Sequence, residues 1–181
     1  MSRRYLILDR DGVINEDSDL FIKSPEEWVP LPGSLEAIVR LNQAGFSVAV
    51  ATNQSGIARG LFDEQTLNAM HQKLHRELNR LGGQIELIAY CPHGPDAGCE
   101  CRKPKPGLLH QIARRWKIDL RGIPVIGDSQ RDLEAARAVG ARPILVRTGK
   151  GEQTLRTLET TVEVYADLGA AADALLKGDA A

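Results

Sequence analysis

The stretch YLILDRDGVIN, residues 5–15, places a short apolar run directly before a pair of aspartates, Asp9 and Asp11. A run of this length that ends in charged residues is typical of a buried β-strand followed by a polar loop. Similar apolar runs occur at residues 46–51, 85–90, 124–126 and 143–146. Together these five runs predict the strands of one buried sheet.

Apolar residues recur at helical spacing between the predicted strands. The segments that contain Leu35, Leu67, Leu109 and Leu133 show this pattern, and an alanine-rich end from Ala166 onward predicts a last helix with a frayed tail after about residue 177. Alternating strands and helices predict an α/β fold, a doubly wound parallel sheet covered on both faces. Only residues 16–31 and a cysteine-rich loop remain outside this pattern, so we expect no large cap domain.

The composition sets limits on the function. With 181 residues and 43% hydrophobic content, the chain suits a single domain over residues 1–181. The 23 basic and 24 acidic residues leave a net charge of -1, so we expect no nucleic-acid partner. The start does not resemble a signal peptide, and no run approaches the ~20 apolar residues that span a bilayer. We therefore expect a cytoplasmic protein without a membrane partner, and a monomer.

Polar clusters follow three of the predicted strands. The first cluster begins at Asp9, the second comprises Thr52, Asn53, Gln54 and Ser55, and the third is Gly127-Asp128. Ligands of a parallel sheet bind beyond the carboxyl ends of its strands. We therefore expect the three clusters to converge on one site.

Two carboxylates as close in sequence as Asp9 and Asp11 favour a hard divalent cation. Magnesium takes one or two protein carboxylates, which fits Asp9 and Asp128 with a backbone carbonyl near Asp11. A carboxylate can also attack phosphorus, and a second one can act as acid and base. Thr52 and Lys103 are candidates to stabilise the transferred phosphoryl group. Taken singly, these residues also fit a capped turn, a strand-end hydroxyl and a surface lysine.

Three cysteines and one histidine fall within eleven residues. These residues, Cys91, His93, Cys99 and Cys101, have the number and type of ligands of a closed tetrahedral zinc site, and the polar loop 94–98 would be ordered by the metal. Free thiols are the alternative. A structural zinc site is the favoured interpretation, because four protein ligands leave no open position for catalysis.

The motif DRDGVIN at residues 9–15 resembles the signature of the haloacid dehalogenase superfamily, and Thr52, Lys103 and Gly127-Asp128 follow in the expected order. The resemblance implies a Rossmann-like fold in which Asp9 is the nucleophile, Asp11 the acid and base, and Asp9, Asp11 and Asp128 the magnesium site. Thr52 and Lys103 would stabilise the phosphoryl group. Asp132 either supports the metal or favours the helix N-terminus, and we favour the helix role.

Three further motifs narrow the resemblance: TNQSGIARG at 52–60, CPH with CECRKP at 91–104, and LVRTGKG at 145–151. They resemble the heptose bisphosphate phosphatases, which are related to the histidinol-phosphate phosphatases. The resemblance implies that the enzyme removes the 7-phosphate of a heptose 1,7-bisphosphate during synthesis of nucleotide-activated heptose, a lipopolysaccharide core precursor. It also implies substrate contacts from Asp17, Ser18, Asp19, Leu20, Asn53, Gln54, Ser55 and Arg102, with Arg102 on the uncleaved phosphate. The alternative functions are a histidinol-phosphate phosphatase and an inactive zinc-organised binding module.

The glycines around Lys150 do not make a nucleotide-binding P-loop, because the upstream glycine spacing and the following Ser or Thr are missing. Arg147 and Lys150 could lie near an anionic substrate or be exposed charges. For Trp28, Trp116 and His71, packing or surface positions are the simplest expectation.

Overall fold

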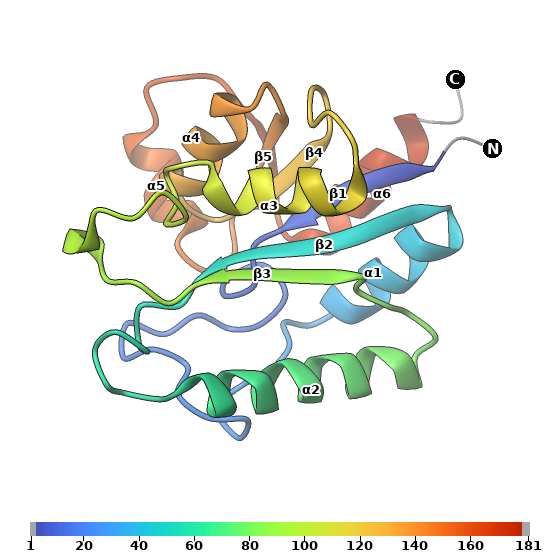
Figure 1. Cartoon of the computed structure of the whole chain (residues 1–181). Coiled ribbons are helices and arrows are strands. Elements are labelled where there is room, and N and C mark those ends of the chain that lie inside the picture. Colours follow the sequence, from blue (N-terminus) through green and yellow to red (C-terminus); the bar gives the residue numbers. More distant parts are fainter. Residues whose placement is uncertain (1–2, 179–181) are drawn as a thin grey trace.

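The computed structural model describes residues 3–178, so the end of the predicted frayed tail, residues 179–181, lies outside the described residues. Six parallel strands form one sheet in the order β3-β2-β1-β4-β5-β6. The strands are β1 (Arg4–Leu8), β2 (Phe46–Asn53), β3 (Leu87–Cys91), β4 (Pro124–Gly127), β5 (Arg142–Val146) and β6 (Glu163–Tyr165). The predicted α/β fold is confirmed (Figure 1).

Helices cover both faces of the sheet (Figure 1). They are α1 (Ser34–Gln43), α2 (Glu64–Arg80), α3 (Gly107–Trp116), α4 (Gln130–Ala138), α5 (Gly151–Thr157) and α6 (Leu168–Gly178), with a 3-10 turn, η1 (Pro95–Ala97). The buried faces of α1, α2 and α6 share one hydrophobic cluster, and those of α3 and α4 share another. Because each face has its own cluster, the strands are buried on both sides, as their near-continuous apolar runs require.

The central strands are the most deeply buried part of the fold. Leu6, Ile7 and Leu8 of β1 have no solvent exposure, and their side chains alternate between the two hydrophobic clusters. The alternation follows from the period of two in a β-strand. The strand end after Leu8 is therefore held rigidly from both faces, which fixes the residues that follow it.

The structure differs from the sequence prediction at some boundaries. Strand β2 continues two residues further than predicted, through Asn53, and β3 begins at Leu87 and ends at Cys91. Strand β6 and helix α5 were not predicted. Both are short, and neither carries an apolar run: the three residues of β6 are only partly buried, and α5 reads GEQTLRT. Pairing with the edge of β5 makes β6 a strand despite its weak pattern.

The sheet order reverses between β1 and β4, which are adjacent in the sheet but far apart in the sequence. Such a reversal opens a crevice at the carboxyl ends of the two strands, and ligands bind there in open α/β sheets. Asp9 follows β1 and Asp128 follows β4. Among the described residues, no separate cap domain covers this crevice.

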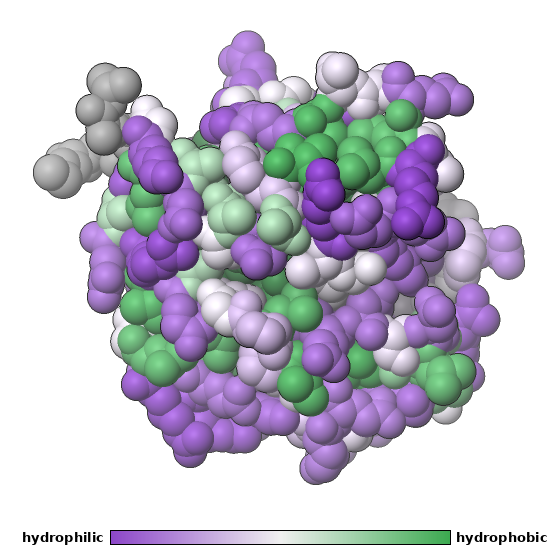
Figure 2. Space-filling view, turned by 180° about the vertical axis from the view of Figure 1, so that it is seen from behind, coloured by the Kyte–Doolittle hydropathy of each residue, from purple (hydrophilic) through white to green (hydrophobic). Residues whose placement is uncertain are grey.

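The face of the molecule opposite to the one seen in Figure 1 is largely hydrophilic, and its hydrophobic side chains lie in separate groups (Figure 2). Within residues 3–178, no helix combines the length and the apolar character that crossing a bilayer would require.

Candidate active site

A pocket of about 260 Å³ lies at the carboxyl ends of the strands. It brings together twelve of the residues predicted for catalysis, substrate binding or magnesium: Asp9, Asp11, Asp17, Ser18, Asp19, Thr52, Asn53, Gln54, Ser55, Arg102, Lys103 and Asp128. Leu20 is not among the lining residues, and 76% of it is exposed. The predicted convergence of the three polar clusters is therefore seen in the fold.

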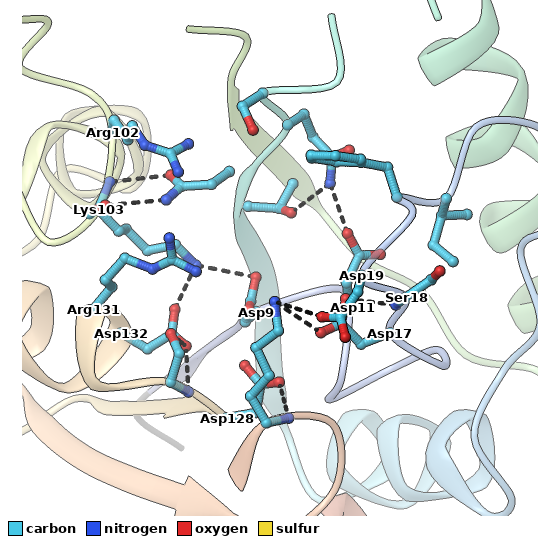
Figure 3. A pocket seen from close by; sticks show the side chains of 18 of the residues that line it. Asp9, Asp11, Asp17, Ser18, Asp19, Arg102, Lys103, Asp128, Arg131 and Asp132 are labelled. Carbon is cyan, nitrogen blue, oxygen red and sulfur yellow. Dashed lines mark hydrogen bonds and ion pairs between the residues drawn. The ribbon is translucent and has the colours of Figure 1, made fainter. Parts of the chain in front are cut away.

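Most of the charged side chains in the pocket are grouped by sign. Figure 3 shows Arg102, Lys103 and Arg131 on one side together with Asp132, which pairs with Lys103, and it shows Asp11, Asp17 and Asp19 on the other side, with Asp9 and Asp128 between them in this view. On the acidic side, Lys150 Nζ lies 3.4 Å from Asp17 Oδ2 and 3.9 Å from Asp19 Oδ1. The arrangement offers cations to the phosphate part of a ligand and carboxylates to its hydroxyl groups.

Lys103 is the buried cation of the site. Its Nζ lies 3.0 Å from Asp9 Oδ1 and 2.6 Å from Asp132 Oδ1, and it donates to the Ala51 carbonyl at 2.6 Å. Burial opposes the charged form, but Asp132 and Asp9 outweigh it and raise the pKa of Lys103. A lysine with three acceptors is held in one position, so Lys103 is charged and aimed at the nucleophile candidate.

The sequence favoured a helix-terminus role for Asp132, and the structure shows a second contact as well. Asp132 Oδ2 accepts from the Ser129 backbone N at 3.0 Å and from Ser129 Oγ at 2.7 Å, which completes a capping box of α4. Its other oxygen pairs with Lys103. Burial alone would raise the pKa of Asp132, but Lys103 and Ser129 lower it. Asp132 therefore links the helix end to the site.

Asp9 and Asp128 are crowded carboxylates without enough positive charge. Burial, together with Asp132, raises the pKa of Asp9 to about 7, and burial, together with Asp9, raises the pKa of Asp128 to about 8. Oxygens of Asp9, Asp128 and Asp132 lie within 4.8 Å of one another. Because Lys103 already neutralises Asp132, the remaining pair is the donor set that suits Mg²⁺.

Asp128 is held in place by the loop that contains Gly149 and Lys150. The Lys150 backbone N donates to Asp128 Oδ2 at 2.8 Å, and a Cβ at Gly149 would lie 2.2 Å from the same oxygen. Gly149 also has a φ of +57°, which favours glycine. Lys150 thus belongs to the pocket, whereas Arg147 pairs with Glu152 at 3.4 Å and does not line it.

Asp11 has four side-chain donors. Asp11 Oδ1 accepts from Arg10 Nε at 2.9 Å and from Asn15 Nδ2 at 2.8 Å. Asp11 Oδ2 accepts from Arg10 Nη2 at 3.1 Å and from Gln54 Nε2 at 3.0 Å. Gln54 Nε2 also donates to Thr52 Oγ1 at 2.8 Å, so the Gln54 amide links Asp11, the predicted acid and base, to Thr52, which is predicted to bind the phosphoryl group.

Asn53 joins the second polar cluster to the lysine segment. Its Oδ1 accepts from the Lys103 backbone N at 3.0 Å, and its Nδ2 donates to the Lys103 carbonyl at 3.1 Å. The extension of β2 through Asn53 makes this reciprocal contact possible. Asn53 therefore positions the backbone of Lys103.

Sequence reasoning missed several residues that line the pocket: Phe21, Ile22, Arg59, Pro95, Ser129 and Arg131. Arg59 lies within the TNQSGIARG motif at residues 52–60, in which only residues 52–55 were predicted to belong to the site, and its guanidinium lies 5.4 Å from the Phe21 ring centroid. Arg131 follows Asp128 by three positions, at the start of α4. Neither position carries a signal that separates it from an exposed surface arginine.

The arginines form a positive edge of the pocket. Burial, and then the neighbouring charges of Arg131 and Arg59, lower the pKa of Arg102. Among the described residues, none of the three arginines forms a salt bridge, and the Arg102 guanidinium donates to the His93 carbonyl, at 3.4 Å. Like charges without a carboxylate partner favour an anionic ligand.

The four predicted zinc ligands lie together beside this edge. Cys91 Sγ lies 3.5 Å from His93 Nδ1, 3.7 Å from Cys99 Sγ and 3.1 Å from Cys101 Sγ. His93 Nδ1 lies 3.2 Å from Cys101 Sγ, and the cysteines form no disulfide. Three cysteine sulfurs and one imidazole nitrogen around one point fit a tetrahedral Zn²⁺ site.

Comparisons with known proteins agree with this geometry. A family model described as polynucleotide kinase 3 phosphatase matches residues 7–134, and one described as HAD-hydrolase-like matches residues 100–171. The D-glycero-beta-D-manno-heptose-1,7-bisphosphate 7-phosphatase of Bordetella bronchiseptica is 57% identical over 176 residues, which cover 96% of this chain and 98% of that protein. Its counterpart in Pseudomonas aeruginosa is 59% identical over 178 residues, 98% and 100% of the two chains.

Among solved structures, the D,D-heptose 1,7-bisphosphate phosphatase of B. bronchiseptica, complexed with magnesium and phosphate, superposes with a TM-score of 0.95. It is 56% identical, and the match covers 97% of this chain and 99% of that one. The corresponding phosphatase of Burkholderia thailandensis is 49% identical with a TM-score of 0.76, over 96% and 99% of the two chains.

Proposed function

Because the chain belongs to the HAD-like phosphatases, in the family of the D-glycero-beta-D-manno-heptose-1,7-bisphosphate 7-phosphatases, we propose that it hydrolyses the 7-phosphate of this bisphosphate. The observation that carries the proposal is the pocket itself. It holds a carboxylate pair for a cation, a buried lysine beside the nucleophile candidate and an arginine edge for a second anion. The product, a heptose 1-phosphate, would feed the synthesis of nucleotide-activated heptose for lipopolysaccharide.

Asp9 is the nucleophile in this proposal. An oxygen of Asp9 forms a bond to the 7-phosphorus while the bond from phosphorus to the sugar oxygen breaks, which leaves a phosphoryl group on Asp9. Water then attacks that phosphorus and releases inorganic phosphate. The rigid end of β1 and the 3.0 Å contact with Lys103 hold Asp9 in place for both steps.

Asp11 moves the protons. It gives a proton to the departing sugar oxygen in the first step and takes one from the attacking water in the second. Asp11 reaches the pocket from the loop after β1, and 21% of its side chain is exposed there. The exposed part of its side chain is therefore accessible to a substrate in the pocket.

The phosphoryl group needs cations and donors around its oxygens. Lys103 and the Thr52 hydroxyl line the pocket next to Asp9 and supply a charge and a donor. Asp9 and Asp128 would hold Mg²⁺, which supplies further positive charge when bound, together with the backbone carbonyl near Asp11. The raised pKa values of the two carboxylates support this assignment.

A second phosphate explains the arginine edge. Arg102, Arg131 and Arg59 line the same pocket without carboxylate partners, and a planar guanidinium suits a phosphate dianion. Histidinol phosphate has no second phosphate to place there. The acidic side, with Asp17, Ser18 and Asp19, would bind the sugar hydroxyls, and Leu20 would touch the sugar only if this loop moved.

Zinc in the Cys91, His93, Cys99 and Cys101 cluster would hold the segment that continues into Arg102 and Lys103. The role is structural, because four protein ligands complete the coordination. Metal analysis of the purified protein tests it: one zinc per chain is expected in the wild type and a strong loss in Cys99→Ser. Equal zinc in both would exclude this site.

The function is tested by phosphate release from heptose 1,7-bisphosphate and from histidinol phosphate, each with Mg²⁺ and with EDTA. Asp9→Asn is the blank, and fast Mg²⁺-dependent release from the bisphosphate is expected. Arg102→Ala should raise KM for the bisphosphate strongly, whereas Arg147→Ala, which removes an exposed arginine outside the pocket, should not.

A preference for histidinol phosphate would keep the mechanism and reject the substrate. No release from either compound by folded protein would favour another phosphate ester as the substrate, or an inactive binding module. The intact set of Asp9, Asp11, Thr52, Lys103 and Asp128 argues against that module, because binding alone does not require it.

A further inference from the structure

Arg10 is a charged residue with no role in the proposed chemical steps. It follows the nucleophile directly, and its side chain has no solvent exposure. Its backbone N donates to Asp9 Oδ1 at 2.8 Å, while the guanidinium turns away from the pocket and contacts Asp11, Gln54 and His71. A fully buried guanidinium carries a desolvation penalty of several kcal/mol, so its retention requires specific partners.

The partners hold the guanidinium at both ends. Toward Asp11, Nε donates to Oδ1 at 2.9 Å, and Nη2 lies 2.8 Å from Oδ1 and 3.1 Å from Oδ2, so two nitrogens of the guanidinium contact the carboxyl group. Toward the protein interior, Nη2 lies 3.3 Å from Gln54 Oε1 and Nη1 lies 3.3 Å from His71 Nε2. Gln54 follows β2 and His71 lies on α2, so two separate elements fix the fork.

His71 must accept from Arg10, because a guanidinium has only donors. Its Nε2 is therefore unprotonated and the ring is neutral. Burial, together with the charge of Arg10, lowers the pKa of His71 to about 3, in agreement with a neutral ring. His71 therefore acts as a hydrogen-bond acceptor that does not exchange protons, and it orients the plane of the Arg10 guanidinium.

We propose that Arg10, held by His71 and Gln54, is a positioning residue that aims the Asp11 carboxyl group at the leaving-group oxygen. The inference rests on the proposed function of Asp11 as acid and base. A carboxyl group can rotate about its last side-chain bond, and the planar fork of Arg10 removes that freedom. Asn15 Nδ2, at 2.8 Å from Asp11 Oδ1, supports the same orientation.

The consequence is specific to one proton transfer. When an alkoxide leaves, Asp11 must deliver a proton to it as the bond to phosphorus breaks, and such transfers contribute roughly 10²–10⁴-fold to rates. When a stable phenolate leaves, little protonation is needed. A misaimed Asp11 therefore slows phosphorylation of Asp9 more for poor leaving groups than for good ones.

The test uses Arg10→Lys, which keeps a buried positive charge but removes the fork. Single-turnover release of phenol is measured for a series of aryl phosphates from 4-nitrophenyl to unsubstituted phenyl phosphate, and sugar release for heptose 1,7-bisphosphate. We expect 4-nitrophenyl phosphate to change by less than about threefold, and the bisphosphate to slow by about 10- to 100-fold, a part of the full acid contribution. Asp11→Asn should show the same trend more strongly.

Arg142→Lys is the matched control. Arg142 also forms a fork, with Nε 2.5 Å from Glu163 Oε1 and Nη2 2.7 Å from Oε2, but it joins β5 to β6 outside the pocket. It should leave the leaving-group dependence unchanged. If Arg10→Lys does not fold, His71→Leu removes the acceptor that orients Arg10 and should show the same trend.

Equal slowing of every aryl phosphate in a folded Arg10→Lys protein would overturn the proposal, because a purely structural role predicts no dependence on the leaving group. Unchanged rates would overturn it as well. The aryl series does not depend on the heptose: wild-type protein that cleaves aryl phosphates but not the bisphosphate would reject the proposed substrate while the comparison of slopes still tests Arg10.

Discussion

Asp132 makes two kinds of contact, and Asp132→Asn separates them. Asparagine keeps an oxygen that can accept from Ser129 and preserve the capping box. Its amide nitrogen would then face Lys103 Nζ, which now lies 2.6 Å from Asp132 Oδ1. The substitution therefore leaves the helix cap in place and replaces a buried ion pair with two opposed donors.

The loss of stability in Asp132→Asn depends on the partners that Lys103 retains. Removing one partner of a buried ion pair costs about 3–5 kcal/mol when the other charge is left alone. Lys103 retains Asp9 at 3.0 Å, and the loss of the Asp132 carboxylate relieves the repulsion that, in addition to burial, raises the pKa values of Asp9 and Asp128. We therefore expect a loss of about 2–3 kcal/mol in the free energy of unfolding, at or below the low end of that range.

Ser129→Ala provides the comparison, because it removes the hydroxyl contact of the same capping box without touching Lys103. Loss of such a cap costs about 1 kcal/mol. Urea unfolding of both variants without added metal measures the difference, and the phosphate-release assay should show a lower kcat only for Asp132→Asn. Equal stability losses and an unchanged kcat would refute the ion-pair argument and leave Asp132 as a helix cap.

Three further changes probe the supports of the site. Gly149→Ala should weaken the apparent Mg²⁺ affinity by about tenfold in a magnesium titration of activity, since the new Cβ would lie 2.2 Å from Asp128 Oδ2; an unchanged affinity would contradict this. Asn53→Ala should cost about 1–3 kcal/mol in urea unfolding and lower kcat, because it removes two hydrogen bonds to the Lys103 backbone; a loss of stability alone would limit it to folding. The pKa of His71 is about 3 in the folded protein and 6.5 in the unfolded chain, so the unfolded chain binds an extra proton between these pH values. The free energy of unfolding therefore falls as the pH drops from 6.5 toward 3, by up to about 1.4 kcal/mol per pH unit. His71→Gln should flatten that part of the unfolding curve, and an identical slope would contradict the assignment.

The sequence predicted the centre of the fold because the central strands are buried on both faces. Such strands must be nearly all apolar, and the run before Asp9 shows it directly. The edge strand β6 escaped prediction for the opposite reason. Its three partly buried residues owe their conformation to pairing with β5, and no local pattern records that contact.

The same distinction applies to the site. Asp9, Thr52 and Asp128 stand at strand ends, so their convergence follows from sheet topology alone. Arg59 and Arg131 come from a loop and a helix start, and whether such a side chain faces the pocket depends on how the two elements pack. The sequence contains these arginines but does not show their orientation.

Asp132 and Arg10 have roles that the sequence alone does not predict. Each sits in a position with an ordinary local explanation, a helix cap and a charge between two aspartates. Each also has a buried partner far along the chain: Lys103 is 29 residues from Asp132, and His71 is 61 residues from Arg10. Both partners are hidden from solvent, where an uncompensated charge is costly and a paired one is held rigidly. Lys103 and Arg10 thus fix the two acidic groups that the proposed chemistry needs, the nucleophile Asp9 and the proton carrier Asp11. Burial of these cations turns a flexible pair of carboxylates into groups with defined directions.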